Sequence, residues 1–461
     1  MTRHCTSRYL FMMIISLALG GCGGLLPRSQ YVRPELSVPQ KWQAPAVTGS
    51  SVAAKENWWR DFQDATLSEL IERALRTNND LAAAAIKVKR ARLSSKLTDT
   101  NLTPNLSASV NASYQRNLDN HGELKSSGAA ATASYEVDLW GKLASARDAS
   151  RWEAEATEWD RRSTALTLVG TVAADYWTIA YLNDRIASVE ASIANAERVL
   201  ELVKVKYQAG SVAALDKVQA QQTVVSQKAQ LTQLQQQRSE ARNALAILFD
   251  QAPENKLPEL QRLPSGALPK VEAGLPAAIL AQRPDLQAAE LRLKKYLATV
   301  DATRASYYPS FTLTGSLGTS STSLVEVIKN PYALLGAGLS LPFIQWNTMK
   351  LNVEISRTDY QEAVVNFRQA LYSALSDVEN ALSARSNDAE EVRQLEESLS
   401  LSQKAEQLAE IRYRAGSTAL QSWLDAQESR RDAERSLAAG RLSQLKNSMT
   451  LYQSLGGSMK L

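Results

Sequence analysis

The sequence contains very little cysteine and histidine, and both scarcities limit the chemistry open to it. Its two cysteines are Cys5 and Cys22, and its two histidines are His4 and His121. We expect His4 and Cys5 to lie in a segment that is removed, which excludes an internal disulfide and a metal site made of several histidines. The sequence also lacks a glycine-rich phosphate loop and a nucleophile elbow. We therefore expect no catalytic residue and no metal site.

A large excess of charge of one sign is also missing. The formal net charge is +4, and it falls to about +2 without Arg3 and Arg8, so no global positive field indicates binding to nucleic acid. Beyond residue 22 we expect no apolar run that is long enough for a transmembrane helix. If the protein crosses a membrane, strands must form the crossing.

Residues 1–21 have the pattern of an export signal. Two arginines precede a short apolar core, and the segment ends in Leu19-Gly20-Gly21-Cys22. This ending resembles a bacterial lipobox, which implies cleavage before Cys22 and acylation of that residue, palmitate included. Gly23 is not the aspartate that retains lipoproteins at the inner membrane, so the resemblance implies the outer membrane. The alternative is an ordinary signal peptide in which Cys22 is incidental. A covalent lipid on Cys22 is the only cofactor that we expect.

The stretch from about Leu143 to Tyr207 carries a nearly unbroken apolar seam. Its residues follow one another at steps of three and four: Val172, Tyr176, Ile179, Leu182, Ile186, Val189, Ile193, Ala196, Leu200, Val203 and Tyr207. This spacing predicts one long helix, roughly 95 Å at about 1.5 Å per residue, that packs in a coiled coil with other long helices. A second such helix is expected from Asn347 to Tyr413. We therefore expect an elongated helical bundle or tube.

The chain repeats itself after about 200 residues. Tyr207-Gln208-Ala209-Gly210-Ser211 returns as Tyr413-Arg414-Ala415-Gly416-Ser417, which is 206 positions further along. A neighbouring offset of 205 positions carries Asp80-Leu81 onto Asp285-Leu286. We interpret the chain as one unit written twice.

Each repeat also contains a region in which apolar and polar residues alternate. In the first, Leu106, Ala108, Val110, Ala112 and Tyr114 alternate with polar residues, and so do Ala129 to Leu139 after a loop. In the second, Phe311 to Leu317 and Leu335 to Phe343 repeat the pattern. A period of two over about ten residues is typical of strands that cross a bilayer, although a half-buried sheet in a soluble protein shows it too. Four strands cannot close into a barrel, so we expect several copies to share one.

The arrangement resembles the TolC-like outer-membrane channels, specifically the lipoprotein branch that serves tripartite efflux pumps. The matching residues are Cys22, Tyr31-x-Arg33-Pro34, Trp58-Trp59 with Phe62 and Asp64, Asp138-Leu139-Trp140-Gly141, Gln282-Arg283-Pro284-Asp285-Leu286, Tyr308-Pro309-Ser310, Leu341-Pro342-Phe343 and Leu424-Asp425-Ala426-Gln427. They cover the mature chain in order.

The resemblance implies a mainly helical chain with a membrane β-barrel, built of four long-helix segments, four transmembrane strands and two internal repeats. It implies a homotrimer with a twelve-stranded barrel in outer-membrane lipid and a helical tunnel in the periplasm. The expected partners are a periplasmic adaptor and an inner-membrane transporter of the RND type. The expected function is passive export of drugs, other toxic small molecules or ions, and hence antibiotic resistance. Alternatives are the duct of a type I-like protein secretion system and a lipid-anchored periplasmic coiled-coil scaffold.

The same resemblance places the gate at the periplasmic tip. The tip turns contain Gly210, Ser211, Gly416 and Ser417, and the expected constriction contains Tyr207, Tyr413, Asp216 and Asp425. Rings of acidic residues in a narrow pore favour cations. The alternative is that both aspartates are ordinary residues near a helix start. Thr418 and Ser422 replace an arginine and an aspartate of the archetype, so the closed state needs different contacts here.

We divide the chain accordingly. The expected parts are the signal 1–21, a lipid-anchored extended strap 22–57, a first repeat 58–250 with its hairpin at about 104–139, a proline-rich linker 251–284 and a second repeat 285–461 with its hairpin at about 309–343.

Overall fold

The computed structural model describes residues 28–35, 37–44, 56–119, 121–253, 257–271, 273–323, 326 and 329–457. Cys22 and the signal 1–21 lie outside these residues. The chain divides into two compact units. The first, here called the strand unit, contains Ile86–Trp159, Ala288–Gln369 and the strap residues 28–35. The second, here called the tip unit, contains Ser37–Ala85, Asp160–Gln287 and Ala370–Leu461.

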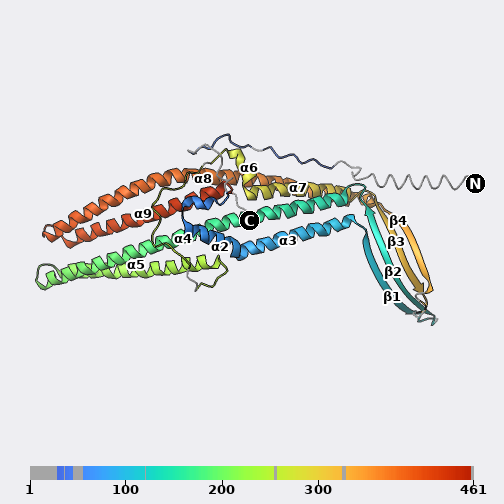
Figure 1. Ribbon diagram of the computed structural model, residues 1–461, viewed down its shortest axis with the longest axis horizontal. Coiled ribbons are helices and arrows are strands. Elements are labelled where there is room, and N and C mark those ends of the chain that lie inside the picture. Colours follow the sequence, from blue (N-terminus) through green and yellow to red (C-terminus); the bar gives the residue numbers. More distant parts are fainter. Residues whose placement is uncertain are drawn as a thin grey trace, which may run out of the picture. The chain divides into compact units, whose positions relative to one another are not determined.

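The strand unit contains one antiparallel sheet of four strands (Figure 1). The strands are β1 (Asn105–Arg116), β2 (Glu123–Val137), β3 (Ser310–Ser321) and β4 (Pro331–Ser340), and they pair in the order β1-β2-β3-β4. Each repeat therefore supplies one hairpin, and β2 joins the first hairpin to the second through β3. The four strands confirm the prediction from alternation.

The strand register brings the alternating residues onto common faces. Leu106 lies opposite Ala133, Ala133 opposite Gly315, and Gly315 opposite Leu335. Directly opposed residues of an antiparallel pair share a face of the sheet, so the apolar sets of all four strands coincide. Serine, threonine and asparagine occupy the opposite face, for example Ser107, Thr132 and Thr312. One apolar and one polar face result.

The second hairpin ends earlier than the alternation predicts. Leu341 and Phe343 were expected to continue the strand, but β4 ends at Ser340 and Pro342–Ile344 form a short 3-10 helix (η6). Pro342 has no N–H to donate to a neighbouring strand, and its fixed φ suits the first position of a helical turn. The expectation of strand through Phe343 was therefore wrong.

Helices flank the strands in both repeats. The first repeat has α2 (Ala65–Thr77), α3 (Asn79–Asp99), the 3-10 turn η3 (Thr100–Leu102), α4 (Lys142–Gln208) and α5 (Ala214–Ile247). The second repeat has α7 (Pro284–Ala305), α8 (Trp346–Arg414) and α9 (Leu420–Ser454). The two long helices fall within one residue of the expected bounds at each end.

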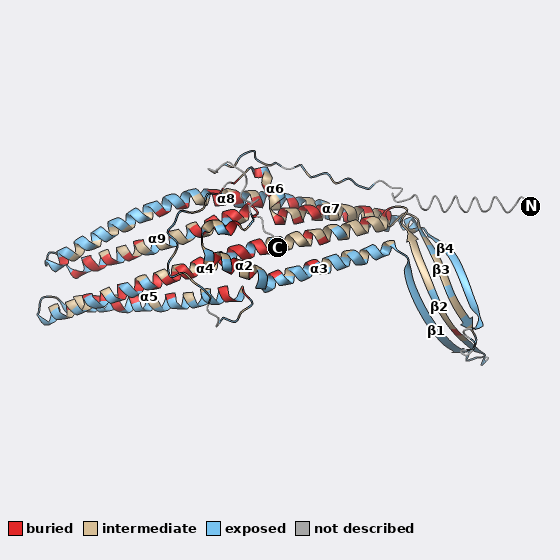
Figure 2. Ribbon diagram, viewed as in Figure 1, coloured by how far each residue is buried: buried red, intermediate tan, exposed pale blue. Residues whose placement is uncertain are grey.

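The predicted seam of α4 forms the core of the tip unit. Val172, Tyr176 and Ile179 are at most 1% exposed, and the seam stays buried through Val203 apart from the half-buried Leu200 (Figure 2). Leu182, Ile186, Val189 and Ile193 pack with Leu234 of α5 in one apolar cluster. The steps of three and four thus identified the buried face of this helix.

The apolar seam also corrects the expectation about membrane-spanning helices. An 18-residue window of α4 has a mean hydropathy of 1.2, which is apolar enough to cross a membrane by composition alone. Within the residues that the structure describes, α4 is the one such helix, and 67% of that window is buried in the protein. Packing in a helical core accounts for its apolar character.

Aromatic residues anchor the 3-10 helix η2 to the longer helices of the tip unit. Trp58 and Trp59 lie in η2 (Trp58–Phe62) and are 0% and 2% exposed. The Trp58 ring stacks on Tyr452 at 4.8 Å between centroids, and Phe62 lies 5.1 Å from Trp177. These rings are packing anchors within the tip unit. The proline-rich linker contains the short helices η4 (Pro276–Ala278) and α6 (Ile279–Gln282).

Candidate functional site at the helical tips

The two helical hairpins of the tip unit are joined by the same tight turn. Gly210 follows α4 with φ +71°, and Gly416 follows α8 with φ +74°. The Ser211 N–H donates to the Lys206 carbonyl at 2.8 Å, and the Ser417 N–H donates to the Arg412 carbonyl at 2.9 Å. A left-handed glycine followed by this wider hydrogen bond is a Schellman end of a helix. The repeated sequence therefore produces a repeated backbone.

The tyrosines before these turns have different surroundings. Tyr413 is 4% exposed and packs on Trp423 of α9, with ring centroids 5.4 Å apart. Tyr207 is 42% exposed. The ammonium group of Lys217 lies 5.6 Å from the Tyr207 ring centroid, which is longer than the 4.3 Å between Lys206 and the Tyr413 ring centroid.

Tyr413 belongs to a small apolar cluster that joins the two hairpins. The cluster contains Val199 and Val203 of α4, Ala220 of α5, Tyr413 of α8, and Leu420, Trp423 and Leu424 of α9. The ammonium group of Lys206 lies over the Tyr413 ring, 4.3 Å from its centroid. A cation at this distance from an aromatic face is attracted by its quadrupole, so Lys206 ties α4 to α8. We call the seven apolar residues together with Lys206 the tip cluster.

Burial raises the pKa of the Tyr413 phenol, and the negative charge of Asp216 raises it further. The phenol is therefore neutral at physiological pH. A neutral ring keeps the aromatic face that Lys206 contacts.

Of the two aspartates of the expected constriction, Asp216 lies in the first turn of α5 and Asp425 lies in the second turn of α9. The Asp216 carboxylate is half-buried and accepts a hydrogen bond from the Ala213 N–H at 3.0 Å, at the start of α5. The Asp425 carboxylate is exposed and accepts from the Gln421 amide at 2.6 Å. Both carboxylates thus have local helix contacts, as the alternative interpretation expects. Their placement in a pore stays a prediction.

Sequence reasoning missed two residues of the tip cluster, Lys206 and Trp423. Trp423 lies three residues after Leu420 and three before Ala426, so helical spacing alone could have placed it on the buried face. Lys206 carried no such signal, because its partner Tyr413 is more than 200 positions away.

Further along the tip unit, charged residues connect three helices. The Arg430 guanidinium of α9 pairs with Glu406 of α8 and with Glu434. Ser188 of α4 donates a hydrogen bond to Glu434 at 3.2 Å. Because Arg430 satisfies two carboxylates at once, this network holds α8 and α9 in a fixed register beside α4.

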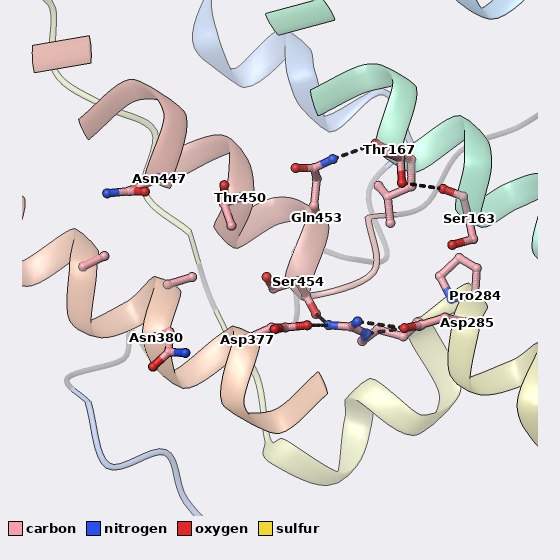
Figure 3. A pocket seen from close by; sticks show the side chains of 14 residues that line it. Ser163, Thr167, Pro284, Asp285, Asp377, Asn380, Asn447, Thr450, Gln453 and Ser454 are labelled. Carbon is pink, nitrogen blue, oxygen red and sulfur yellow. Dashed lines mark hydrogen bonds and ion pairs between the residues drawn. The ribbon is translucent and has the colours of Figure 1, made fainter. Parts of the chain in front are cut away.

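Arg283, Pro284 and Asp285 of the Gln-Arg-Pro-Asp-Leu stretch line a pocket of about 540 Å³ in the tip unit (Figure 3). Arg283 pairs with Asp285 at 2.8 Å and with Asp377 of α8 at 3.2 Å, and it donates to the Ser454 carbonyl at the end of α9. Since its charge is matched by two carboxylates, Arg283 acts as a joint between α7, α8 and α9. It leaves no free cation for a ligand.

The strap residues are held by buried carboxylates of the strand unit. Arg33 forms two hydrogen bonds with Glu290, at 3.0 and 2.7 Å, and the Tyr31 hydroxyl donates to the same carboxylate at 3.2 Å. Ser29 donates to both oxygens of Asp301 at 2.7 Å. These contacts explain the Tyr-x-Arg-Pro stretch as a docking segment on α7.

A metal centre is not evident in the part of the chain that the structure describes, since these residues contain no group of three or more metal-ligating side chains.

The sequence and fold match known proteins over nearly the whole chain. A profile described as outer membrane efflux protein matches residues 70–249 and 275–457, one match for each repeat. The pyoverdine export outer membrane protein OpmQ of Pseudomonas putida is 32% identical over 468 residues, covering 98% of this chain and 97% of that protein. The cation efflux system protein CusC of Escherichia coli is 30% identical, covering 97% and 98%.

Solved structures agree with these matches. The open state of the Neisseria gonorrhoeae MtrE outer membrane channel has a TM-score of 0.79 and 31% identity, covering 94% of this chain and 98% of that one. A CusC crystal structure has a TM-score of 0.83 and 27% identity, covering 95% and 100%. Because the family profile matches both repeats, and relatives match nearly the whole chain, this chain is a member of the outer membrane efflux protein family and functions as an outer-membrane efflux channel.

Proposed function

We propose that three copies of this chain form one passive channel of a tripartite efflux pump, each donating its four strands to a shared twelve-stranded barrel. The open sheet is the observation that carries this proposal. Strands β1 and β4 form its two edges, and both are exposed along their whole length. Unpaired edges are not tolerated in hydrocarbon, and pairing β4 of one copy with β1 of the next removes them.

The apolar face of the sheet supports a membrane position. Val110 is 87% exposed, Leu317 is 68% exposed and Leu335 is 90% exposed, and the register places all three on one face. A contiguous apolar face of this kind marks contact with lipid or protein. The polar face of the same strands would line an aqueous lumen.

Lipid on Cys22 would add a second attachment to the membrane. The supporting observation is the Leu19-Gly20-Gly21-Cys22 ending of an export signal. The docked residue Ser29 is seven positions from Cys22, so the lipid would reach at most about 25 Å from Asp301 at about 3.5 Å per residue. Because Asp301 lies near the end of α7, shortly before β3, the lipid and the strands could enter the same membrane.

The tip turns would form the gate and the contact with a periplasmic adaptor, which would connect the channel to an inner-membrane transporter of the RND type. Three copies each of Asp216 and Asp425 would form acidic rings that favour cations. The tip cluster, with Lys206 on Tyr413, would take the place of the arginine and aspartate contacts that Thr418 and Ser422 cannot make. The energy for export would come from the transporter, so no catalytic residue is needed.

The substrates would be drugs, other toxic small molecules or ions. Relatives carry names that refer to pyoverdine, toluene, antibiotics and cations. Such diversity fits a conduit that leaves selection to its transporter. A periplasmic scaffold is disfavoured, because its sheet would expose a large apolar face to water. A protein secretion duct would share the fold, and full-length likeness to efflux proteins argues against it.

Cysteine cross-linking between the sheet edges tests the proposal. Ser109→Cys on β1 is combined with Gly336→Cys or Gly338→Cys on β4, and all three positions lie on the polar face. The two β4 positions test two registers of pairing between neighbouring chains. Ser109→Cys with Ala130→Cys is the matched control, because these residues are directly opposed within one chain. We expect the edge pairs to give covalent trimers that still conduct ions and restore drug resistance to a strain lacking its own channel. A monodisperse, non-conducting monomer in which only the control pair cross-links would refute the proposal.

A further inference from the structure

A second pocket lies in the strand unit, where the strands meet the helices. Its volume is about 630 Å³, and its walls come from the end of α7, the connection between α7 and β3, η6 and the first turns of α8. Apolar and aromatic side chains are prominent in its lining, among them Tyr308, Phe343 and Trp346. Phe343 and Trp346 are 44% and 63% exposed, which is unusual for side chains of this size in water.

The lining of the pocket also carries a net positive charge. Arg304, Lys350 and Arg357 line it, against one carboxylate, Glu354. Glu354 lies 3.9 Å from Arg357, and both side chains are more than half exposed, so this pair is weak. Arg304 pairs with Asp301 at 3.2 Å. Lys350 is exposed and makes no ion pair with the described residues. An anion with an apolar body would match both parts of the pocket.

We propose that this pocket binds the headgroup and upper acyl chains of an anionic phospholipid in the periplasmic leaflet of the outer membrane. The proposal rests on the proposed function, because it needs the sheet to lie in the bilayer. The pocket is at the helical end of the strands, away from both hairpin loops, which places it at the membrane surface that faces the periplasm. Aromatic side chains collect at that level, as Trp140 and Tyr308 do, with ring centroids 5.1 Å apart.

Charge argues against a neighbouring copy as the sole occupant. If β4 pairs with β1 of the next chain, the helix that leads into that β1, α3, comes closest to the pocket. The exposed cations of α3 are Lys87, Lys89, Arg90, Arg92 and Lys96, of which Arg92 pairs with Glu158 of α4 at 3.2 Å, and the acidic residues of α3 are Asp80 and Asp99 at its ends. Two positively charged surfaces repel each other, and an anionic headgroup between them removes the repulsion. A free phosphate has no apolar part to cover the exposed rings of Phe343 and Trp346.

The test is native mass spectrometry of the purified full-length channel with added palmitoyl-oleoyl phosphatidylglycerol or phosphatidylcholine of the same chains. The pocket variant is Lys350→Gln with Arg357→Gln. The matched control is Arg368→Gln with Lys404→Gln, which removes the same charge from exposed positions of α8 outside the pocket. We expect the wild type to retain phosphatidylglycerol in preference to phosphatidylcholine. The pocket variant should bind phosphatidylglycerol about tenfold more weakly, and the control variant should bind it as the wild type does.

Three results would overturn the proposal: equal retention by both variants, complete displacement of the lipid by inorganic phosphate, or loss of the oligomer in the pocket variant alone, which would assign the pocket to a neighbouring copy. Single-channel recording of the wild type separates the two hypotheses. A conducting wild type with any of these results refutes lipid binding only, whereas a wild type that forms no pore refutes the proposed function itself.

Discussion

The two helical tips share a repeated turn sequence but differ in how firmly the tyrosine before the turn is packed. Both turns have a left-handed glycine and the same pair of hydrogen bonds. In the second repeat the preceding tyrosine, Tyr413, is buried against Trp423 and covered by Lys206. In the first repeat Tyr207 is 42% exposed.

The difference comes from the neighbours of each tyrosine. At the offset of 206 positions, Trp423 corresponds to Lys217, and Asp216 corresponds to Ser422. An indole buries a large apolar area, whereas a lysine keeps its ammonium in water. The tyrosine of the second tip is therefore the more firmly packed one, and the two hairpins are not equivalent.

The largest predicted effect compares Trp423→Ala with Lys217→Ala. Removing the buried indole leaves a cavity in the tip cluster and should destabilise the tip locally by about 3–5 kcal/mol. Lys217→Ala removes an exposed side chain and should change local stability by less than about 0.5 kcal/mol. Amide hydrogen exchange of the tip segments in the assembled channel measures both. Equal protection in the two variants would contradict the unequal packing of the tips.

The glycine turns should respond equally. Gly210→Ala and Gly416→Ala each place a side chain at positive φ, at a cost of about 1–2 kcal/mol. An added Cβ meets no atom within 4 Å at either position, so the backbone conformation is the whole cost. Hydrogen exchange of the two turns is again the measurement, with the exposed Ser211→Ala as a neutral control. A large difference between the two glycine variants would show that the turns are not equivalent.

Lys206→Gln should separate the two tips more finely. It removes the cation from the Tyr413 ring and should cost about 0.5–2 kcal/mol, whereas Arg412→Gln at the equivalent, exposed position should cost almost nothing. A double-mutant cycle with Tyr413→Leu isolates the pairwise energy. Additive single effects would rule out the cation–π contact as a link between α4 and α8.

The smallest effect on stability is expected for Asp216→Ala with Asp425→Ala. Losing the Asp216 contact to the Ala213 N–H should cost about 1 kcal/mol or less. We nevertheless expect higher single-channel conductance and weaker cation selectivity in planar bilayers, because the acidic rings would be gone. Glu391→Ala, an exposed acid on α8, is the control. Unchanged conductance and selectivity in the double variant would remove both aspartates from the gate.

Much of this architecture could be predicted from periodicity. The seam of α4 and the four strands were found because a helix repeats every 3.6 residues and a strand every two, whatever their partners. The end of β4 was missed because the alternation of Leu341 and Phe343 outlasted the hydrogen bonding that Pro342 ends. The apolar window in α4 was not expected, because the sequence analysis interpreted the same stretch only as the packing seam of a coiled coil.

Local sequence by itself determined the turns at Gly210 and Gly416, the buried seam and the alternation of the strands, because each depends on residues a few positions apart. Only the tertiary structure decided that Lys206 covers Tyr413, that the apolar sets of four strands share one face, and that cations and aromatic rings meet in a pocket beside Trp346. Those contacts join residues that are far apart in the chain, and their energy depends on burial and distance, which no local pattern contains.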